Sequence, residues 1–493
     1  MAIARHGRPK HAARHRASQK QDAVARAAWA FAAWLAFVFL TGGGSRHDIE
    51  SLVYLRPIAL IVIAASIWFL PRGALAQIRT PLVLLIALAL LMAAQLVPLP
   101  PDIWTGLWNR EIVAEISRTI GVGDAWRPLT LSPMKTENSL ASLAVPLATL
   151  LLFSLVPQQN RRVIWWTILG AALLSAVIGL AQTALGARGL YFYKITNIGD
   201  AVGLFSNRNH NAVFLAISVL ICTRLSFAPL RQQNWPQVAG LAIAALFLTL
   251  VTLVNGSRAG LLCLVASWAL ALGWLLLSLP RLGLSAKLLR FSRIAAGVFA
   301  AGVAALAVLL VATGRSGSAS RLAATSDIEE LRLQVLPTLL DMTATTQPFG
   351  IGFGAFEYAY RMVEPAELLG PAYFNNAHND WLQIAIEGGI PGILIALVAV
   401  FVVLRGGWRL IGSLRDPAAA DGRRDDALLA FLSLAIFAVA SIVDYPLRTP
   451  SMMAFAIVLL ALVCAPALNR RDGISHDGRG AEEGAALKQK DGK

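Results

Sequence analysis

Charged residues are scarce in this chain. Only 14% of its 493 residues are Asp, Glu, Lys or Arg, whereas 57% are hydrophobic, and the mean hydropathy is +0.62. A water-soluble domain with this balance has too few polar side chains to cover its surface. The composition therefore excludes an ordinary soluble protein and predicts an integral membrane protein.

The chain also has few cysteines and lacks an obvious internal repeat. Its three cysteines, Cys222, Cys263 and Cys464, all lie inside apolar runs, where cysteine behaves as a small buried hydrophobic residue. Neither a disulfide framework nor a thiolate metal site is indicated. No internal repeat is apparent, which disfavours the repeat-built architecture of many transporters.

Basic residues outnumber acidic ones, and their positions follow a membrane topology. The 43 Lys and Arg against 28 Asp and Glu give a formal net charge of +15 and a pI near 10.3, which would also suit a nucleic-acid binder. The basic residues, however, lie in short loops and tails between hydrophobic runs. Because alternate loops are rich in them, the positive-inside rule predicts that both termini are cytoplasmic, and no nucleic acid is expected as a partner.

Hydrophobic runs long enough to cross a bilayer recur along the chain. A span needs about 20 apolar residues, and the runs predict an all-α membrane protein with about twelve spans. A basic cytoplasmic tail, residues 1–22, precedes the membrane domain, residues 23–467, and residues 468–493 form a second cytoplasmic tail. The first span is expected to remain as a signal anchor, because no small-residue cleavage pattern follows it. The predicted spans are 24–41, 53–70, 81–98, 138–156, 163–185, 208–227, 237–255, 259–279, 293–313, 379–404, 427–444 and 450–467.

Two long segments are predicted on the outer side of the membrane. The first, residues 99–137, carries tryptophans that suit a layer at the membrane interface, namely Trp104, Trp108 and Trp126. The second, residues 314–376, joins spans nine and ten, and a connection this long in a compact bundle is usually a functional loop or lid. Two helical patterns and a glycine-rich turn are expected in it, at 327–345, 354–368 and 347–354.

Three spans that begin at the outer face open with polar residues. These starts comprise residues 205–211, 255–260 and 375–380. Their predicted N-caps are Asn207, Ser257 and Asn376. If the three starts converge, their free backbone N–H groups, together with Arg208 and Arg258, form an anion site suited to phosphate. Each arginine is also consistent with an interfacial side chain that extends to the lipid headgroups.

His378 stands at the start of span ten, where a lone histidine is commonly a cap or a satisfied polar residue. Glu387 follows nine residues later. In a continuous helix this spacing turns Glu387 by about 180° and moves it about 13.5 Å along the axis, so Glu387 is not expected to orient His378. The acidic group Asp327, Glu329 and Glu330 is typical of a solvated charge run, and no metal site is predicted.

The turn 444–450 between the last two spans carries a further charged pair. Arg448 lies four residues after Asp444 in this tight turn. We expect Asp444 to hold it as a structural ion pair.

Several of these motifs together resemble the signature of the bacterial O-antigen ligase and O-antigen polymerase superfamily. The resemblance rests on Pro348-Phe349-Gly350-Ile351-Gly352-Phe353-Gly354-Ala355-Phe356, on Ala377-His378-Asn379 followed by Leu382, Glu387, Gly389 and Gly392, and on the upstream motifs 205–209 and 256–260. The ten residues between His378 and Gly389 also fit the polymerase pattern. The resemblance is strongest over residues 180–405, and the predicted layout agrees with it along nearly the whole chain. Arg448 matches none of its motifs.

The resemblance implies a GT-C-type membrane glycosyltransferase of the bacterial inner membrane, with its active site facing the periplasm. Such enzymes transfer a glycan from undecaprenyl pyrophosphate to an acceptor hydroxyl, without a metal, nucleotide sugar or other cofactor. In a ligase the acceptor is lipid A-core, and in a polymerase it is a growing carrier-linked glycan. The expected partners are therefore the lipid-linked donor, one of these acceptors and the surrounding membrane lipids.

The resemblance also implies roles for individual residues. His378 is the base that takes the proton of the acceptor hydroxyl, since an imidazole has a pKa of about 6.5. Arg208 and Arg258 stabilise the pyrophosphate as its negative charge grows. Further candidate contacts to glycan or phosphate, in the large loop and at the helix starts, are Arg321, Arg332, Asn207 and Asn379.

Four functions remain open at this point. An O-antigen ligase, acting in lipopolysaccharide assembly, is favoured. A polymerase of O-antigen or exopolysaccharide shares the same donor and site, and a protein O-oligosaccharyltransferase is a weaker alternative. A twelve-helix transporter belongs to a different class and predicts charges near the middle of the bilayer, whereas the strongest polar motifs here lie on one face.

Overall fold

The computed structural model of the protein describes residues 8–279, 297, 327–369, 374–413 and 422–465. It is mostly helical, at 76% helix and 1% strand, as predicted for an all-α membrane protein. Among the described residues, eight helical stretches are long and apolar enough to cross a membrane, and three shorter apolar helices accompany them. Each overlaps a predicted span, and the remaining predicted span, 293–313, lies almost entirely outside the described residues.

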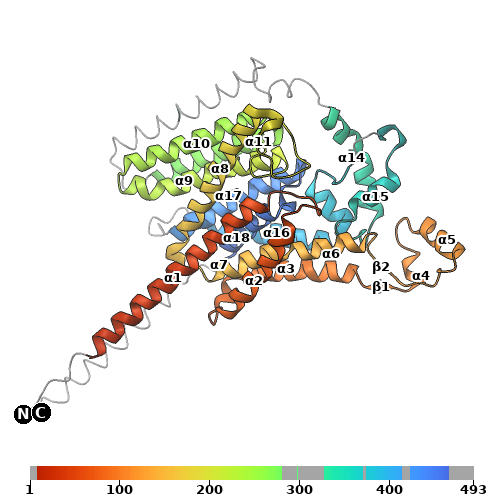
Figure 1. The fold of residues 1–493 in the computed structure, drawn as a ribbon, viewed down its shortest axis with the longest axis horizontal. Coiled ribbons are helices and arrows are strands. Elements are labelled where there is room, and N and C mark those ends of the chain that lie inside the picture. Colours follow the sequence, from red (N-terminus) through yellow and green to blue (C-terminus); the bar gives the residue numbers. More distant parts are fainter. Residues whose placement is uncertain (1–7, 280–296, 298–326, 370–373, 414–421, 466–493) are drawn as a thin grey trace, which may run out of the picture.

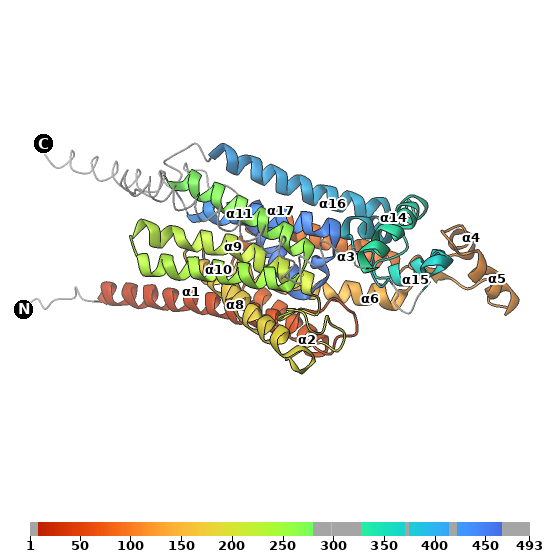
Figure 2. The same ribbon diagram turned by 90° about the horizontal axis from the view of Figure 1, so that it is seen from above.

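The apolar helices lie side by side in one bundle (Figures 1 and 2). They are α1 (Arg8–Thr41), α2 (Leu52–Trp68), α3 (Ala74–Gln95), α6 (Pro133–Ser142), α7 (Ala144–Ser154), α8 (Arg162–Leu185), α9 (Arg208–Arg231), α10 (Trp235–Asn255), α11 (Arg258–Ser278), α16 (Asp380–Ser413), α17 (Gly422–Val443) and α18 (Pro450–Cys464). Among the eight described spans, helix α9 is the most deeply buried, since 78% of the residues in its most apolar stretch lie inside the protein. It packs on α8, α10, α11 and α17. A helix that is apolar on every side is suited to such a central place.

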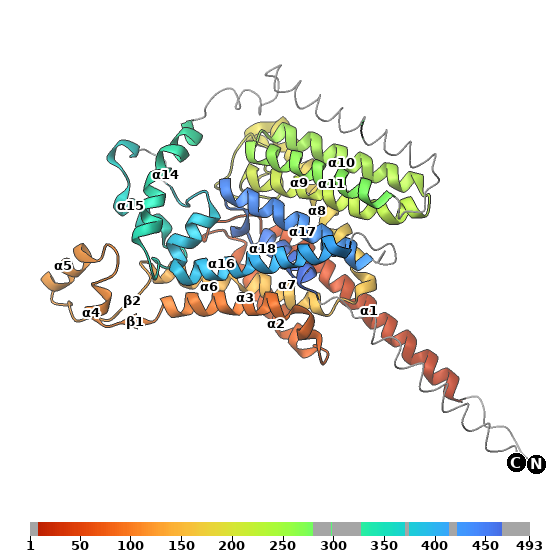
Figure 3. The ribbon, with the colours of Figure 1, turned by 180° about the vertical axis from the view of Figure 1, so that it is seen from behind.

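The two ends of the bundle differ. One end, which we call the loop end, carries α14 (Asp327–Thr345) and α15 (Phe356–Val363) (Figures 2 and 3). Helix α1 begins at the opposite end, which we call the tail end. The positions of α14 and α15 confirm the two helical patterns predicted for the long loop.

A small arm also projects from the loop end (Figure 3). It contains α4 (Pro101–Trp104) and α5 (Glu111–Thr119), and the antiparallel strands β1 (Pro98–Leu99) and β2 (Arg127–Pro128) close its base. Trp104, predicted to face the membrane interface, is instead 6% exposed. The guanidinium carbons of Arg110 and Arg127 lie 4.9 and 5.2 Å from its ring centre, so cation–π contacts hold this ring inside the arm.

Helix α16 is broken at Gly389. This residue has φ 59° and ψ −158°, a conformation that residues with a Cβ rarely adopt. The break leaves carbonyl groups of the preceding turn without helical donors, and the predicted glycine-rich turn 347–354 supplies replacements. The N–H groups of Ile351 and Gly352 donate to the carbonyls of Ile386 and Glu387 at 3.0 and 3.1 Å. The two glycine-rich motifs thus form one structural unit at the loop end.

Candidate active site

The polar start of α16 lies at the loop end. The helix begins at Asp380, and Asn379 is its N-cap, because the Asn379 side-chain oxygen accepts from the N–H of Leu382 at 3.1 Å. The prediction that Asn376 caps this helix is therefore wrong. His378 has a φ of 50°, which turns the chain just before the helix and moves its start three residues further along. Asn376 therefore lies outside the helix.

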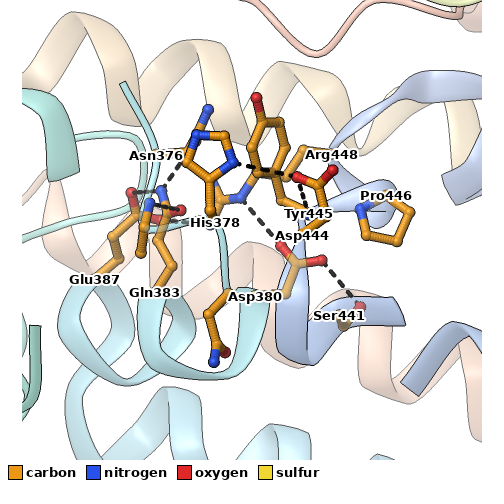
Figure 4. A network of polar contacts seen from close by, with 12 residues as sticks. Asn376, His378, Asp380, Gln383, Glu387, Ser441, Asp444, Tyr445, Pro446 and Arg448 are labelled. Carbon is orange, nitrogen blue, oxygen red and sulfur yellow. Dashed lines mark hydrogen bonds and ion pairs between the residues drawn. The ribbon is translucent and has the colours of Figure 1, made fainter. Parts of the chain in front are cut away.

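His378 is held against the carboxylate of Asp444, in the turn after α17. Its Nδ1 lies 3.4 Å from Oδ1 of Asp444 (Figure 4). The rings of Tyr445 and Phe374 meet the imidazole edge to face, with ring centres at 4.9 and 6.0 Å. A positive φ in a residue with a Cβ persists only where its surroundings hold it. The ring of His378 is consequently fixed by its backbone, its aromatic neighbours and Asp444.

Asp444 connects the starts of α9 and α16. Its Oδ2 accepts from Nδ2 of Asn209 at 2.6 Å, and its Oδ1 accepts from the N–H of Tyr445 at 3.0 Å. The side chain is 1% exposed, so these bonds set its orientation. An imidazole that donates from Nδ1 to a carboxylate presents Nε2 as its proton acceptor. The pair of His378 and Asp444 thus has the arrangement of a general base and the group that orients it.

The starts of α9 and α11 have the caps that the sequence predicted. Asn207 caps α9 by accepting from the N–H of Asn209 at 2.8 Å. Ser257 caps α11 by accepting from the N–H of Gly260 at 2.9 Å. Both predictions are confirmed.

All three polar starts are connected by hydrogen bonds. Nδ2 of Asn255, just before α11, donates to the carbonyl of Arg208 in α9 at 3.1 Å. Asn209, the next residue of α9, reaches Asp444 and through it His378. The convergence expected from the sequence is therefore present. At the start of α9, however, the N–H groups of Arg208 and Asn209 already donate to the side-chain oxygens of Asn197 and Asn207.

The two arginines predicted to bind pyrophosphate are the first residues of α9 and α11. Nη1 of Arg208 forms an ion pair with Oδ2 of Asp200 at 2.8 Å. Arg258 is half-buried at the start of α11. Asp200 was not foreseen as a partner, because it lies in the loop before α9 and belongs to none of the motifs.

Two further arginines predicted to contact glycan or phosphate lie at the edge of the described chain. Arg321 lies outside the described residues. Arg332 belongs to α14, where the structure describes its backbone but not its side chain. Their contacts to a substrate stay predictions.

Arg448 pairs with two carboxylates of α16 instead of Asp444. Its Nε lies 3.3 Å from Asp380, and its Nη2 lies 3.2 Å from Glu387. The expected pair of Arg448 and Asp444 is therefore wrong, because the Asp444 carboxylate is directed toward His378. Burial would lower the pKa of Arg448, but the carboxylates of Glu387 and Asp380 outweigh it and raise the pKa, so the guanidinium stays charged.

Glu387 takes no part in orienting His378, as the spacing predicted. Its buried carboxylate accepts from Arg448 and from Nε2 of Gln383, the latter at 3.0 Å. Figure 4 shows Glu387 and Asp444 on opposite sides of the imidazole. His378 precedes the first residue of α16 and has a positive φ, so the contacts of Glu387, and not a continuous helical spacing, separate the two side chains.

A cavity of about 710 Å³ opens beside this network, where Asp380, Trp381 and Arg448 form part of its wall. Arg56 of α2 and Lys135 of α6 also line it, and neither was singled out from the sequence. Nζ of Lys135 lies 2.8 Å from Nε2 of His47. Burial and the positive charge of Lys135 lower the pKa of His47, so a neutral imidazole faces the ammonium group.

Residues 243–397 match the family described as O-antigen ligase, whereas no curated protein matches the chain. The matched segment includes the start of α11, the turn 347–354, His378 and the break in α16. Members of this family are glycosyltransferase-like enzymes of polysaccharide assembly. With its many apolar helices, the chain is a multi-pass membrane protein, and it carries an O-antigen ligase domain over residues 243–397.

Proposed function

We propose that the protein transfers a glycan from undecaprenyl pyrophosphate to an acceptor hydroxyl, as an O-antigen ligase. The loop end would face the periplasm from the bacterial inner membrane, with both termini in the cytoplasm. One observation carries this proposal. In a chain whose residues 243–397 match the O-antigen ligase family, a histidine faces a buried carboxylate beside three converging helix N-termini.

His378 is the proposed general base. Its Nε2 takes the proton of the acceptor hydroxyl while the hydroxyl oxygen attacks the anomeric carbon of the donor sugar. The bond from that carbon to the diphosphate oxygen breaks, and the diphosphate leaves with the electron pair. Asp444 stabilises the imidazolium that forms, as the carboxylate does in a catalytic triad. A positioned base of this kind contributes about 10²–10⁴-fold to a rate.

Arg208 and Arg258 are the proposed counter-charges for the leaving diphosphate. Each begins a helix, so the helix N-terminus adds a positive partial charge. Arg208 contacts Asp200 through Nη1, but a guanidinium has five N–H donors. It therefore keeps donors for a phosphate oxygen while paired. Asn207, Asn379, Arg321 and Arg332 remain candidate contacts to the glycan or the diphosphate.

The acceptor separates the proposed ligase from a polymerase, which would use the same base and donor. We would reconstitute the purified protein in liposomes with a defined undecaprenyl-diphosphate-linked repeat as donor. Lipid A-core and a second carrier-linked repeat would compete as acceptors, and mass spectrometry would identify the products. A ligase yields lipid A-core that carries the glycan, whereas a polymerase yields elongated carrier-linked glycan. Absence of transfer to both acceptors would contradict the proposed reaction.

A further inference from the structure

The cavity beside α16 continues as an apolar groove between α16, α17 and α18. Residues three or four apart on a helix share one face, and each helix lines the groove with such a pair. The pairs are Ala399 and Val403, Ala435 and Ala438, and Ala456 and Leu460. The four alanines leave room between the helices. Alanines on three helices thus line the groove together with larger apolar side chains such as Leu404 and Phe431.

Two cations line the polar mouth of the same cavity without a carboxylate partner. Arg56 donates from Nη2 to Oδ1 of Asn138 at 2.8 Å, and its Nε is buried without a hydrogen-bond partner. Lys135 is 7% exposed and contacts His47 and the ring of Tyr358. Within the described part of the chain, no carboxylate lies within 4.0 Å of either cation. A cation so placed is costly unless an anion accompanies it.

The acidic side chains of the cavity wall do not supply that anion. Asp380 is paired with Arg448, and Glu357 is paired with Arg361 at 2.9 Å. The mouth therefore keeps a positive charge around Arg56 and Lys135. A positive mouth that opens into an apolar groove is complementary to a lipid whose headgroup is anionic.

We propose that this cavity holds the carrier lipid of the donor. Arg56 and Lys135 bind the phosphate on the lipid side of the diphosphate, and the groove holds the adjoining hydrocarbon tail. This inference rests on the proposed function. Arg208 and Arg258 would then contact the other phosphate of the diphosphate, the one whose bond to the sugar breaks.

The position of the cavity favours the donor lipid over the acceptor lipid. Asp380, in the cavity wall, is only two residues from His378. The donor diphosphate is bonded directly to the sugar that reacts, so its lipid must lie close to the base. The lipid part of an acceptor is separated from the attacking hydroxyl by its own glycan. A lipid-phosphate site beside the base therefore suits the donor.

Binding of undecaprenyl diphosphate that carries no glycan tests this inference apart from catalysis. Affinities would be measured by native mass spectrometry on the full chain. Arg56→Met and Lys135→Met should each weaken binding roughly tenfold, because each removes a charge-assisted contact. Ala435→Phe, which fills the groove, should also weaken binding. Arg56→Lys keeps the charge and should retain most of the affinity, which guards against a variant that merely misfolds.

Two matched controls lie outside the cavity. Arg231→Met removes an exposed arginine at the end of α9, and Val439→Phe enlarges a side chain of α17 that is 49% exposed. Both should bind undecaprenyl diphosphate as the wild type does. Wild-type affinity in Arg56→Met and Lys135→Met would overturn the inference. Equal competition by phosphatidylglycerol would also overturn it, since the site would then hold an ordinary membrane lipid.

The same measurements separate this inference from the proposed function. If both hold, His378→Ala binds undecaprenyl diphosphate normally but transfers no glycan. Transfer by His378→Ala, with binding lost in Arg56→Met, would contradict the proposed role of His378 alone. Loss of transfer in His378→Ala, with normal binding in the cavity variants, would contradict the lipid site alone.

Discussion

Two buried aspartates lie near the two ends of α17, and their partners differ in kind. At the tail end, Asp426 accepts from Nε of Arg224 at 2.8 Å and from Nε1 of Trp165 at 2.8 Å. At the loop end, Asp444 faces Nδ1 of His378. A guanidinium keeps its charge at all physiological pH values, whereas an imidazole gains and loses a proton near neutrality. The tail-end group is suited to stability, and the loop-end group is suited to proton transfer.

The surroundings of the two aspartates strengthen this contrast. Asp426 lies among apolar helices that pack closely, because α8, α9 and α17 contact one another there. Asp444 contacts the starts of two helices, α9 and α16, and the neighbouring α16 network borders a cavity. Changes that break the Asp426 pair should therefore alter stability and spare transfer, while changes that break the pair of Asp444 and His378 should chiefly alter transfer.

The largest effect is expected for Asp444→Asn. An amide cannot stabilise the imidazolium of His378 as a carboxylate does, so the transfer rate should fall about 10²–10⁴-fold. Initial rates with a defined lipid-linked donor would measure this. Asp426→Asn is the matched change at the other end of α17 and should retain transfer. An equal loss of activity in both variants would break the contrast.

Arg224→Ala should lower stability rather than activity. It leaves the buried carboxylate of Asp426 without its cation, and breaking such a pair costs about 3–5 kcal/mol of folding free energy. Denaturant unfolding in detergent would measure the loss, with transfer rates normalised to folded protein. The double variant Arg224→Ala/Asp426→Leu removes both charges and should recover part of the stability. A transfer rate that falls with Arg224→Ala would assign the tail end a catalytic role.

Gly389→Ala should destabilise the loop end. A Cβ at Gly389 would lie 2.3 Å from the carbonyl oxygen of Pro348, and the backbone conformation alone costs about 1–3 kcal/mol for a residue other than glycine. Thermal unfolding should show a lower Tm. Gly273→Ala in α11 is the control, because a Cβ there meets no atom within 4 Å and should be neutral or stabilising. An unchanged Tm in Gly389→Ala would mean that the break in α16 is not required.

The smallest effect concerns pH and His47. Its pKa in the folded protein is lowered by burial and by Lys135, whereas the unfolded chain has the ordinary value of about 6.5. The unfolded state therefore takes up the proton first as the pH falls. The contribution of His47 to stability is present above about pH 6.5 and is lost as the pH falls through the lowered pKa. His47→Gln should reduce the Tm difference between about pH 7.5 and about pH 5.5. A Tm difference equal to that of the wild type would contradict this role.

The features that sequence reasoning predicted depend on local patterns. Hydropathy located the spans that the structure describes, because each span needs only a run of apolar residues. The caps Asn207 and Ser257 were predictable because a cap bonds to a backbone group two or three residues away. The cap of α16 was placed three residues too early, since the positive φ of His378 has no clear signal in the sequence.

The features that sequence reasoning missed depend on contacts between distant segments. Asp444 is 66 residues from His378 and 235 residues from Asn209, so no spacing rule connects them. Arg448 was expected to pair with Asp444, and only the packing of its turn against α16 selected Asp380 and Glu387. Arg56 and Lys135 form a pair of cavity cations through tertiary packing alone. A charged pair in the turn 444–450 was visible in the sequence, but its true partners were not.

The proposed role of His378 is tested most directly by the transfer rate of purified His378→Ala in liposomes. The donor would be a defined undecaprenyl-diphosphate-linked repeat, and elution profile and Tm would establish that the variant is folded. The expected result is a rate lower by at least about 10²-fold with an unchanged elution profile. A folded His378→Ala protein that transfers glycan at the wild-type rate would contradict the assignment of His378 as the base.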